Sequence, residues 1–203
     1  MALTTTALTR LRPYADESSL ERAGGQLINW AAITAVNGLK QIRAGTVVGR
    51  KAGKALPCGT SVTLTSVVVA TNVATATLVA HGFAVGDVII VAGANLAYVN
   101  GSKTVATVPT PDTFTFVATG SDATATGTIT ARVTAIGILE TDATEGAGAE
   151  SLSGYSLLVG GVVYESLLPD ATSSPKVLPA AYKTELASAG CTFKYVAYAD
   201  NRS

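Results

Sequence analysis

The chain has 203 residues, of which 48% are hydrophobic and 14% are charged, and its 14 lysines and arginines balance its 14 aspartates and glutamates. This composition excludes a disordered chain and predicts a packed core, in one domain of ordinary size or in two small ones. The charges do not gather in a basic stripe, so nucleic acid and an anionic membrane are not expected partners. No run approaches the roughly 20 apolar residues of a membrane span, and the N-terminus lacks a signal-peptide pattern. Production in the cytoplasm is therefore expected.

Residues 1–26 are predicted to form an N-terminal arm. Threonines and a polar run dominate this stretch and leave few apolar anchors, so it should order on a neighbouring molecule rather than on its own core. Residues 16–23 are compatible with two helical turns that place Leu20 inward, and Gly24 and Gly25 would end those turns.

Residues 27–59 together with 133–203 are predicted to form a β-rich base. Buried strands are expected at 44–50 and at 134–140, where small and β-branched residues run between glycines. Further strands are predicted in the C-terminal part, at 155–159 and 162–167 with a turn at Gly160 and Gly161 between them, and at 191–198.

One helix is predicted near the C-terminus, over residues 178–189. Leu178, Tyr182 and Leu186 are spaced at i, i+4 and i+8, which gives one apolar helical face, and Gly190 follows as the terminator. The fold class is therefore mainly β with this single short helix.

Residues 60–132 differ from the base because their alternation of apolar and polar residues is far more regular. Ala74 and Ala76 share one face and Thr75 and Thr77 share the other, as the period of two in a strand requires. The same alternation runs through Phe114 and Phe116 and through the alanine and threonine residues from 124 to 131. About six short strands separated by turn residues predict a small β-sandwich or barrel.

Few residues are suited to catalysis. His81 is the single histidine and lies where a strand enters a turn, which indicates a structural or exposed role. Cys58 and Cys191 lack the spacing of a zinc or redox site, and two free thiols are the expected state. We therefore expect no enzyme, no cofactor and no metal site.

A cluster of carboxylates, Glu140, Asp142, Glu145 and Glu150, is a weak calcium candidate because it lacks the register of a calcium loop. A solvated acidic loop is the favoured interpretation. Trp30, the only tryptophan, is either a core residue of the base or an anchor where the arm meets a partner, and the core is favoured.

Three stretches of the base resemble the phage lambda-type head decoration proteins. These stretches are 44–49 (AGTVVG), 137–144 (GILETDAT) and 160–169 (GGVVYESLLP). A short helix at 181–189 followed by a strand at 192–196 is similar to the way that family ends.

A longer pattern in residues 60–132 resembles a small β domain common in phage tail and virion proteins. It comprises 80–94 (AHGFAVGDVIIVAGA), 98–105 (YVNGSKTV) and 112–116 (DTFTF). Compact decoration proteins pass almost directly from the first of the base strands to the next, so residues 60–132 are interpreted as an inserted segment.

The resemblance implies a non-enzymatic virion protein that binds and stabilises the outer surface of an assembled phage capsid, a decoration or cement protein. It also implies a homotrimer whose N-terminal arm adds as a strand to the major capsid protein, a contact between sheet edges of the β-augmentation type. The candidate capsid-binding residues are Thr4, Thr5, Thr6, Leu8, Thr9, Leu11 and Tyr14. Two alternatives remain: a phage tail or fibre component, and a carbohydrate-binding or adhesion module whose inserted segment touches a host-surface glycan.

Overall fold

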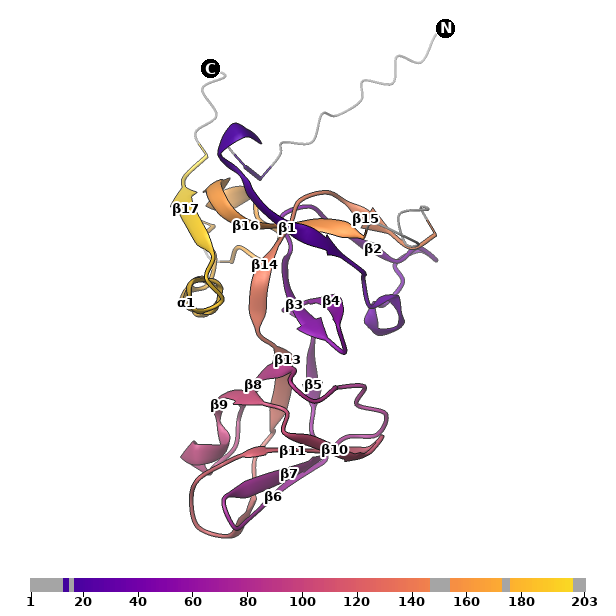
Figure 1. Cartoon of the computed structure of the whole chain (residues 1–203), viewed down its shortest axis with the longest axis vertical. Helices are drawn as coiled ribbons and strands as arrows, with labels where there is room; N and C mark the ends of the chain where they lie inside the picture. Colours follow the sequence, from indigo (N-terminus) through magenta and orange to yellow (C-terminus); the bar gives the residue numbers. More distant parts are fainter. Residues whose placement is uncertain (1–12, 15–16, 147–153, 173–175, 199–203) are drawn as a thin grey trace, which may run out of the picture.

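The computed structural model describes residues 13–14, 17–146, 154–172 and 176–198. The chain is mainly β, as predicted, and α1 (Ala180–Ser188) is the one α-helix in these ranges. Figure 1 shows two β regions arranged along the long axis and joined at a narrow waist. One region contains the strands of the base, and the other contains those of the inserted segment.

A six-stranded sheet organises the base, in the order β1-β16-β14-β3-β4 with β17 beside β16. All pairs are antiparallel except β16 with β17, which is parallel. The strands are β1 (Glu21–Gln26), β3 (Val47–Lys51), β4 (Lys54–Pro57), β14 (Ala135–Leu139), β16 (Tyr155–Tyr164) and β17 (Thr192–Val196). A two-stranded sheet of β2 (Gln41–Ile42) and β15 (Ala143–Thr144) lies in the same region.

The sheet of the base buries side chains on both faces. Val48, Leu139 and Leu157 belong to one apolar cluster, whereas the neighbouring residues Val47 and Ile138 belong to another, as alternation along a strand requires. The second cluster also includes Leu178 and Leu186, which are each 1% exposed. The helix begins at Ala180 and not at residue 178 as predicted, so Leu178 lies just before it. Leu178 and Leu186 are nonetheless both buried, as the predicted apolar face requires, and the helix packs against β14.

The inserted segment contains two sheets that share one core. A five-stranded sheet has the order β10-β11-β7-β6-β12, and a four-stranded sheet has the order β5-β13-β8-β9. The strands are β5 (Ser61–Thr63), β6 (Ser66–Ala70), β7 (Val73–Thr77), β8 (Val88–Ala92), β9 (Gly101–Thr104), β10 (Thr107–Thr110), β11 (Thr113–Val117), β12 (Ala123–Ala125) and β13 (Thr130–Val133). Ala74 and Ala76 are fully buried while Thr75 is exposed, so the alternation predicted for this strand is confirmed.

Four 3-10 turns complete the described secondary structure. They are η1 (Glu17–Ser19), η2 (Trp30–Ala32), η3 (Ala97–Val99) and η4 (Glu165–Leu167). The last of them replaces the end of the strand predicted for 162–167, because the extended backbone stops at Tyr164.

The predicted turn at Gly160 and Gly161 is wrong, since β16 runs through both residues without interruption. A Cβ at Gly160 would lie 2.3 Å from both Glu21 Oε2 and Thr192 Oγ1. Gly161 has φ +116°, and a Cβ there would lie 2.9 Å from Leu20 Cδ2. The glycines are required here because neighbouring segments approach the strand closely, and not because the chain reverses.

Residues 17–23, the described part of the stretch 16–23, do not form two helical turns. The chain makes the short turn η1 and then enters β1, so the last residues of the predicted arm, 21–26, are part of the sheet of the base. Strand pairing with β16 supplies hydrogen-bond partners that an isolated two-turn helix could not match. Leu20 does point inward, as expected, and is 8% exposed.

The alternating run from 124 to 131 divides between the two sheets of the inserted segment. Ala123–Ala125 (β12) pairs with β6, whereas Thr130–Val133 (β13) pairs with β5 and β8. The break falls at Gly127, whose φ is +109° and whose absent Cβ would lie 2.3 Å from Gly93 O. Local alternation could not reveal this change of sheet.

Candidate attachment surface

Of the seven candidate capsid-binding residues, only Tyr14 lies within the described part of the chain. Tyr14 is half-buried, packs against the apolar core of the base and forms an antiparallel bridge with Val163. The other six candidates, Thr4, Thr5, Thr6, Leu8, Thr9 and Leu11, lie outside the described residues.

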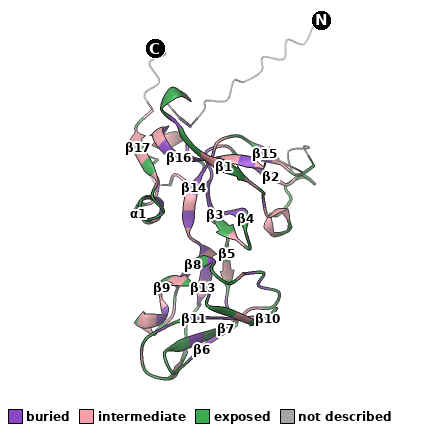
Figure 2. Cartoon of the chain, in the orientation of Figure 1, coloured by how far each residue is buried: buried purple, intermediate pink, exposed green. Residues whose placement is uncertain are grey.

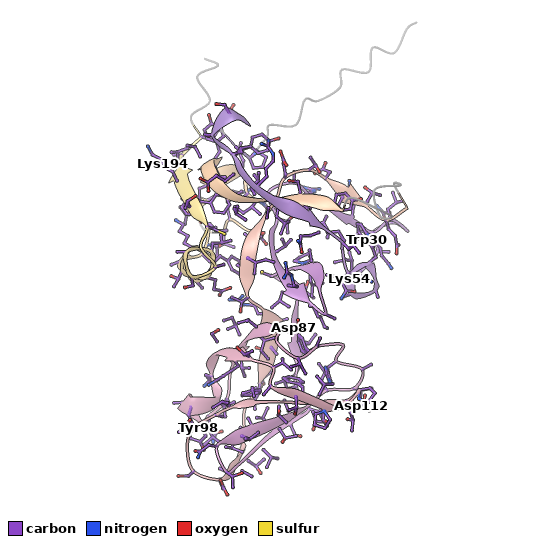
Figure 3. The ribbon with its side chains drawn as sticks, viewed as in Figure 1. Trp30, Lys54, Asp87, Tyr98, Asp112 and Lys194 are labelled. Atoms are coloured by element: carbon purple, nitrogen blue, oxygen red, sulfur yellow. The ribbon has the colours of Figure 1, made fainter. Side chains whose placement is uncertain are left out.

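Both described ends of the chain meet at Tyr164. Its backbone N–H donates a hydrogen bond to Pro13 O (2.8 Å), and its ring contacts the ring of Tyr198 edge-on with centroids 5.1 Å apart. Tyr164 is the last residue of β16, and Figure 1 shows β16 and β17 in the part of the base that faces away from the inserted segment. In Figure 3, Lys194 on β17 lies in that part of the base, while Tyr98 and Asp112 of the inserted segment lie at the opposite end. No local sequence pattern signals this convergence, which depends on the parallel pairing of β17 with β16.

β1 is the edge strand beside this point. It pairs with β16 through a register that shifts twice, and it is terminal in the strand order of the sheet. Figure 2 shows most of β1 exposed. Its charged residues are engaged: Arg22 forms an ion pair with Glu140 (2.7 Å), and Glu21 accepts a hydrogen bond from Thr192 Oγ1 (2.7 Å). Charged side chains on an edge strand hinder unselective pairing with other chains, so access to this edge is restricted.

His81 has a structural environment. It is 2% exposed, its Nδ1 accepts a hydrogen bond from the Phe83 N–H (3.0 Å), and its Nε2 lies 3.4 Å from Thr110 O. The ring also packs against Phe114, with centroids 5.0 Å apart. Both ring nitrogens are occupied in the core, as the predicted structural role requires.

The two thiols are free, that of Cys58 in a buried residue and that of Cys191 in a partly buried one. Cys58 is fully buried, and burial raises the pKa of its thiol well above the ordinary range. Burial also raises the pKa of Cys191, whose Sγ contacts Ile136 O at 3.4 Å. Because the thiolate is the nucleophilic form, these environments do not activate either residue.

The acidic loop is tied to the base through its carboxylates. Glu140 contacts Arg22, Asp142 Oδ1 accepts a hydrogen bond from the Ala44 N–H (2.7 Å), and Glu145 pairs with Lys40 (3.2 Å). Glu150 lies outside the described residues. Among the residues that the structure does describe, no group of three or more His, Cys, Asp or Glu side chains is arranged to hold a metal ion.

Trp30 packs against Tyr155 in the base. Its ring meets that of Tyr155 edge-on at 6.4 Å, and it is a partly buried member of the cluster that includes Leu157. The ring therefore contributes to core packing, as favoured from the sequence.

No family model matches the chain, and no curated protein matches it. Within the described ranges, no helix has the length and apolar character needed to cross a membrane.

Proposed function

We propose that this chain is a structural virion protein that binds the outer surface of an assembled phage capsid and stabilises it. The observation that carries the proposal is the meeting of Pro13 and Tyr198 at Tyr164. It puts Pro13, the first described residue of the predicted arm, at the end of β16, a strand in the part of the base that faces away from the inserted segment (Figure 1). A capsid-bound base with an outward-facing inserted segment accounts for this polarity, and the sequence resemblance to decoration proteins supports the same role.

In this proposal the arm attaches by strand addition. Its candidate residues supply backbone N–H and C=O groups to an exposed sheet edge of the major capsid protein, and its side chains set the register. Each attachment is modest, but copies repeated over the shell, here as homotrimers, clamp neighbouring capsid subunits by multivalency. The inserted segment takes no part in attachment.

Co-sedimentation with expanded, empty capsids of the phage from which the chain derives tests the proposal. The full chain is expected to sediment with the capsids in a saturable manner and to raise the temperature at which they disassemble. Capsids already saturated with unlabelled protein provide the control and should take up no labelled protein. Binding to purified tails with none to capsids would replace this proposal with the tail alternative.

One surface feature supports a second candidate, an adhesion role for the inserted segment. Val73 and Val117 lie opposite each other on β7 and β11 and are 40% and 63% exposed, and Val68 nearby is 44% exposed. On β6 and β7, at this end of the molecule in Figure 2, exposed residues alternate with buried ones. Exposed apolar side chains gathered on one sheet face are typical of interaction surfaces. A glycan-array signal that Val73→Lys abolishes, with capsid binding unchanged, would support this role in addition to the first.

A further inference from the structure

The waist between the base and the inserted segment contains two chain connections, and one of them is very short. Residues 58–60 join β4 to β5, whereas Thr134 alone joins β13 to β14. The Thr134 N–H donates a hydrogen bond to Val88 O (3.0 Å). Gly49 on β3 passes so close that a Cβ there would lie 2.3 Å from Thr134 O. A one-residue connection bonded on one side and crowded on the other leaves little freedom to bend.

Asp87 forms a first polar link across the waist. Its carboxylate is in a side chain only 7% exposed and accepts hydrogen bonds from the Ala52 N–H at 2.9 and 3.2 Å. Ala52 has φ +48° in the tight turn between β3 and β4, which belongs to the base. The same carboxylate accepts a hydrogen bond from the Ala84 N–H (2.8 Å) in its own loop. One side chain therefore fastens a loop of the inserted segment to a hairpin of the base.

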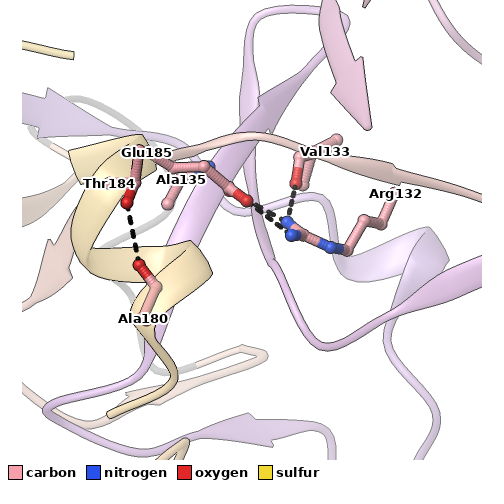
Figure 4. A network of polar contacts seen from close by, with 6 residues as sticks. All are labelled: Arg132, Val133, Ala135, Ala180, Thr184 and Glu185. Atoms are coloured by element: carbon pink, nitrogen blue, oxygen red, sulfur yellow. Dashed lines mark hydrogen bonds and ion pairs between the residues drawn. The ribbon is translucent and has the colours of Figure 1, made fainter. Parts of the chain in front are cut away.

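Glu185 forms a second link from the other direction (Figure 4). The carboxylate of this α1 residue accepts hydrogen bonds from both terminal nitrogens of the Arg132 guanidinium. Nη1 donates to Oε2 at 2.9 Å. Oε2 also accepts a hydrogen bond from the Ala135 N–H (3.0 Å), just past the one-residue connection. The guanidinium lies over the ring of Tyr182, 5.0 Å from its centroid. This arrangement holds β13 against the helix of the base.

The apolar core also continues through the waist. Leu56, Cys58 and Ala135 of the base are buried in the same cluster as Phe83 and Phe114 of the inserted segment. Segments joined by a flexible linker normally keep separate cores and move relative to one another. A shared core together with charge-assisted hydrogen bonds, which are stronger than neutral ones, favours a single rigid body.

We propose that Asp87 and Glu185 act as two clasps that lock the inserted segment to the base in one orientation. This inference is independent of capsid binding. On a surface where many copies are arrayed, it would make the inserted segment project at a fixed angle from every copy. Neither clasp is visible in the sequence, because each joins residues at least 35 positions apart, the smallest separation being that between Ala52 and Asp87.

Nuclear relaxation of backbone 15N in the full chain tests the proposal. In the unaltered protein, amides of both segments are expected to fit one overall tumbling tensor. In the double variant Asp87→Ala with Glu185→Ala, the shared tumbling should be lost, with a shorter correlation time in the inserted segment than in the base. Asp122→Asn is the matched control, because Asp122 accepts its hydrogen bond from the Thr71 N–H within the inserted segment (2.7 Å).

Two outcomes would overturn the proposal: separate tumbling in the unaltered protein, or one tensor retained in the folded double variant. If the alanine variant loses the dispersed amide spectrum of either segment, the isosteric pair Asp87→Asn with Glu185→Gln decides instead. Loss of shared tumbling in that folded double variant supports the proposal, and one unchanged tensor contradicts it.

Discussion

The carboxylate of Glu21 and the hydroxyl of Thr192 meet over Gly160, with Thr192 Oγ1 donating to Glu21 Oε2 at 2.7 Å. This contact joins the two strands that flank β16 and occupies the space that a side chain at position 160 would need.

Substitution of the two glycines of β16 should therefore destabilise the base to different extents. Gly161→Ala is expected to cost roughly 1–3 kcal/mol, because it adds strain at φ +116° and a clash with Leu20. Gly160→Ala should cost less, since the tip of Glu21 can move aside. Urea denaturation measures both, and Gly24→Ala, where nothing lies within 4 Å of the added Cβ, is the control. Equal costs at all three positions would contradict the crowding argument.

Deletion of residues 1–12 should abolish capsid binding and leave the fold intact. The deletion stops short of Pro13 and β1, so the contacts with Tyr164 and β16 are kept. Circular dichroism and co-sedimentation provide the measurements. A variant that keeps the length but replaces residues 4–9 with glycine and serine is the matched control for arm length. Unchanged affinity after the deletion would show that the arm is not the attachment device.

The two thiols should differ in their importance for stability. Cys58→Ser is expected to cost roughly 1–3 kcal/mol, because it places a hydroxyl in a fully buried apolar site. Cys191→Ser should be nearly neutral, since serine can donate to Ile136 O in place of the thiol. Thermal melts of the two variants make the comparison, and assembly should survive in both. A failure of assembly that appears only on a redox shift would point to a disulfide.

The thiols should also react slowly in the folded protein. Burial raises both pKa values, so at pH 8 less thiolate is present than in an ordinary cysteine, whose pKa is about 8.5. The folded protein holds each thiol proton more tightly than the unfolded chain does. This difference contributes to the free energy of unfolding; the contribution is fully present below the ordinary pKa and declines as the pH rises above it. Reaction with a thiol-specific disulfide reagent at pH 8 should be slow, and denaturant should accelerate it. Rapid labelling of the folded protein would contradict the burial of both groups.

Phe114 should be essential to the inserted segment. It is fully buried and contacts the rings of Phe83 at 5.2 Å and Phe116 at 6.2 Å. Phe114→Ala is expected to cost roughly 3–5 kcal/mol, as large-to-small changes in a core do. Val117→Ala on the exposed end of the same strand is the control and should change stability little. A small loss at Phe114 would place it outside the core.

The sequence by itself determined those elements whose signals are local. The strand at Val73–Thr77 followed from strict alternation, because side chains on a strand point to opposite faces in turn. The helix at Ala180–Ser188 followed from the spacing of Leu178, Tyr182 and Leu186, with Gly190 after it. In each case the residues that decide the structure are close neighbours in the chain.

Only the tertiary structure decided the features that depend on distant partners. Glycine permits a turn and also permits close approach, so the local sequence cannot decide the role of Gly160 and Gly161. The neighbours Glu21 and Thr192, which are remote in sequence, decide it at Gly160. In the same way, the edge strand β1 arose where a short helix was compatible with the sequence, because β16 supplied hydrogen bonds from more than 100 residues away. The contacts of the two clasp carboxylates, and those of Pro13 and Tyr198 with Tyr164, likewise depend on distant partners, because contacts between remote residues leave no periodic trace in the sequence.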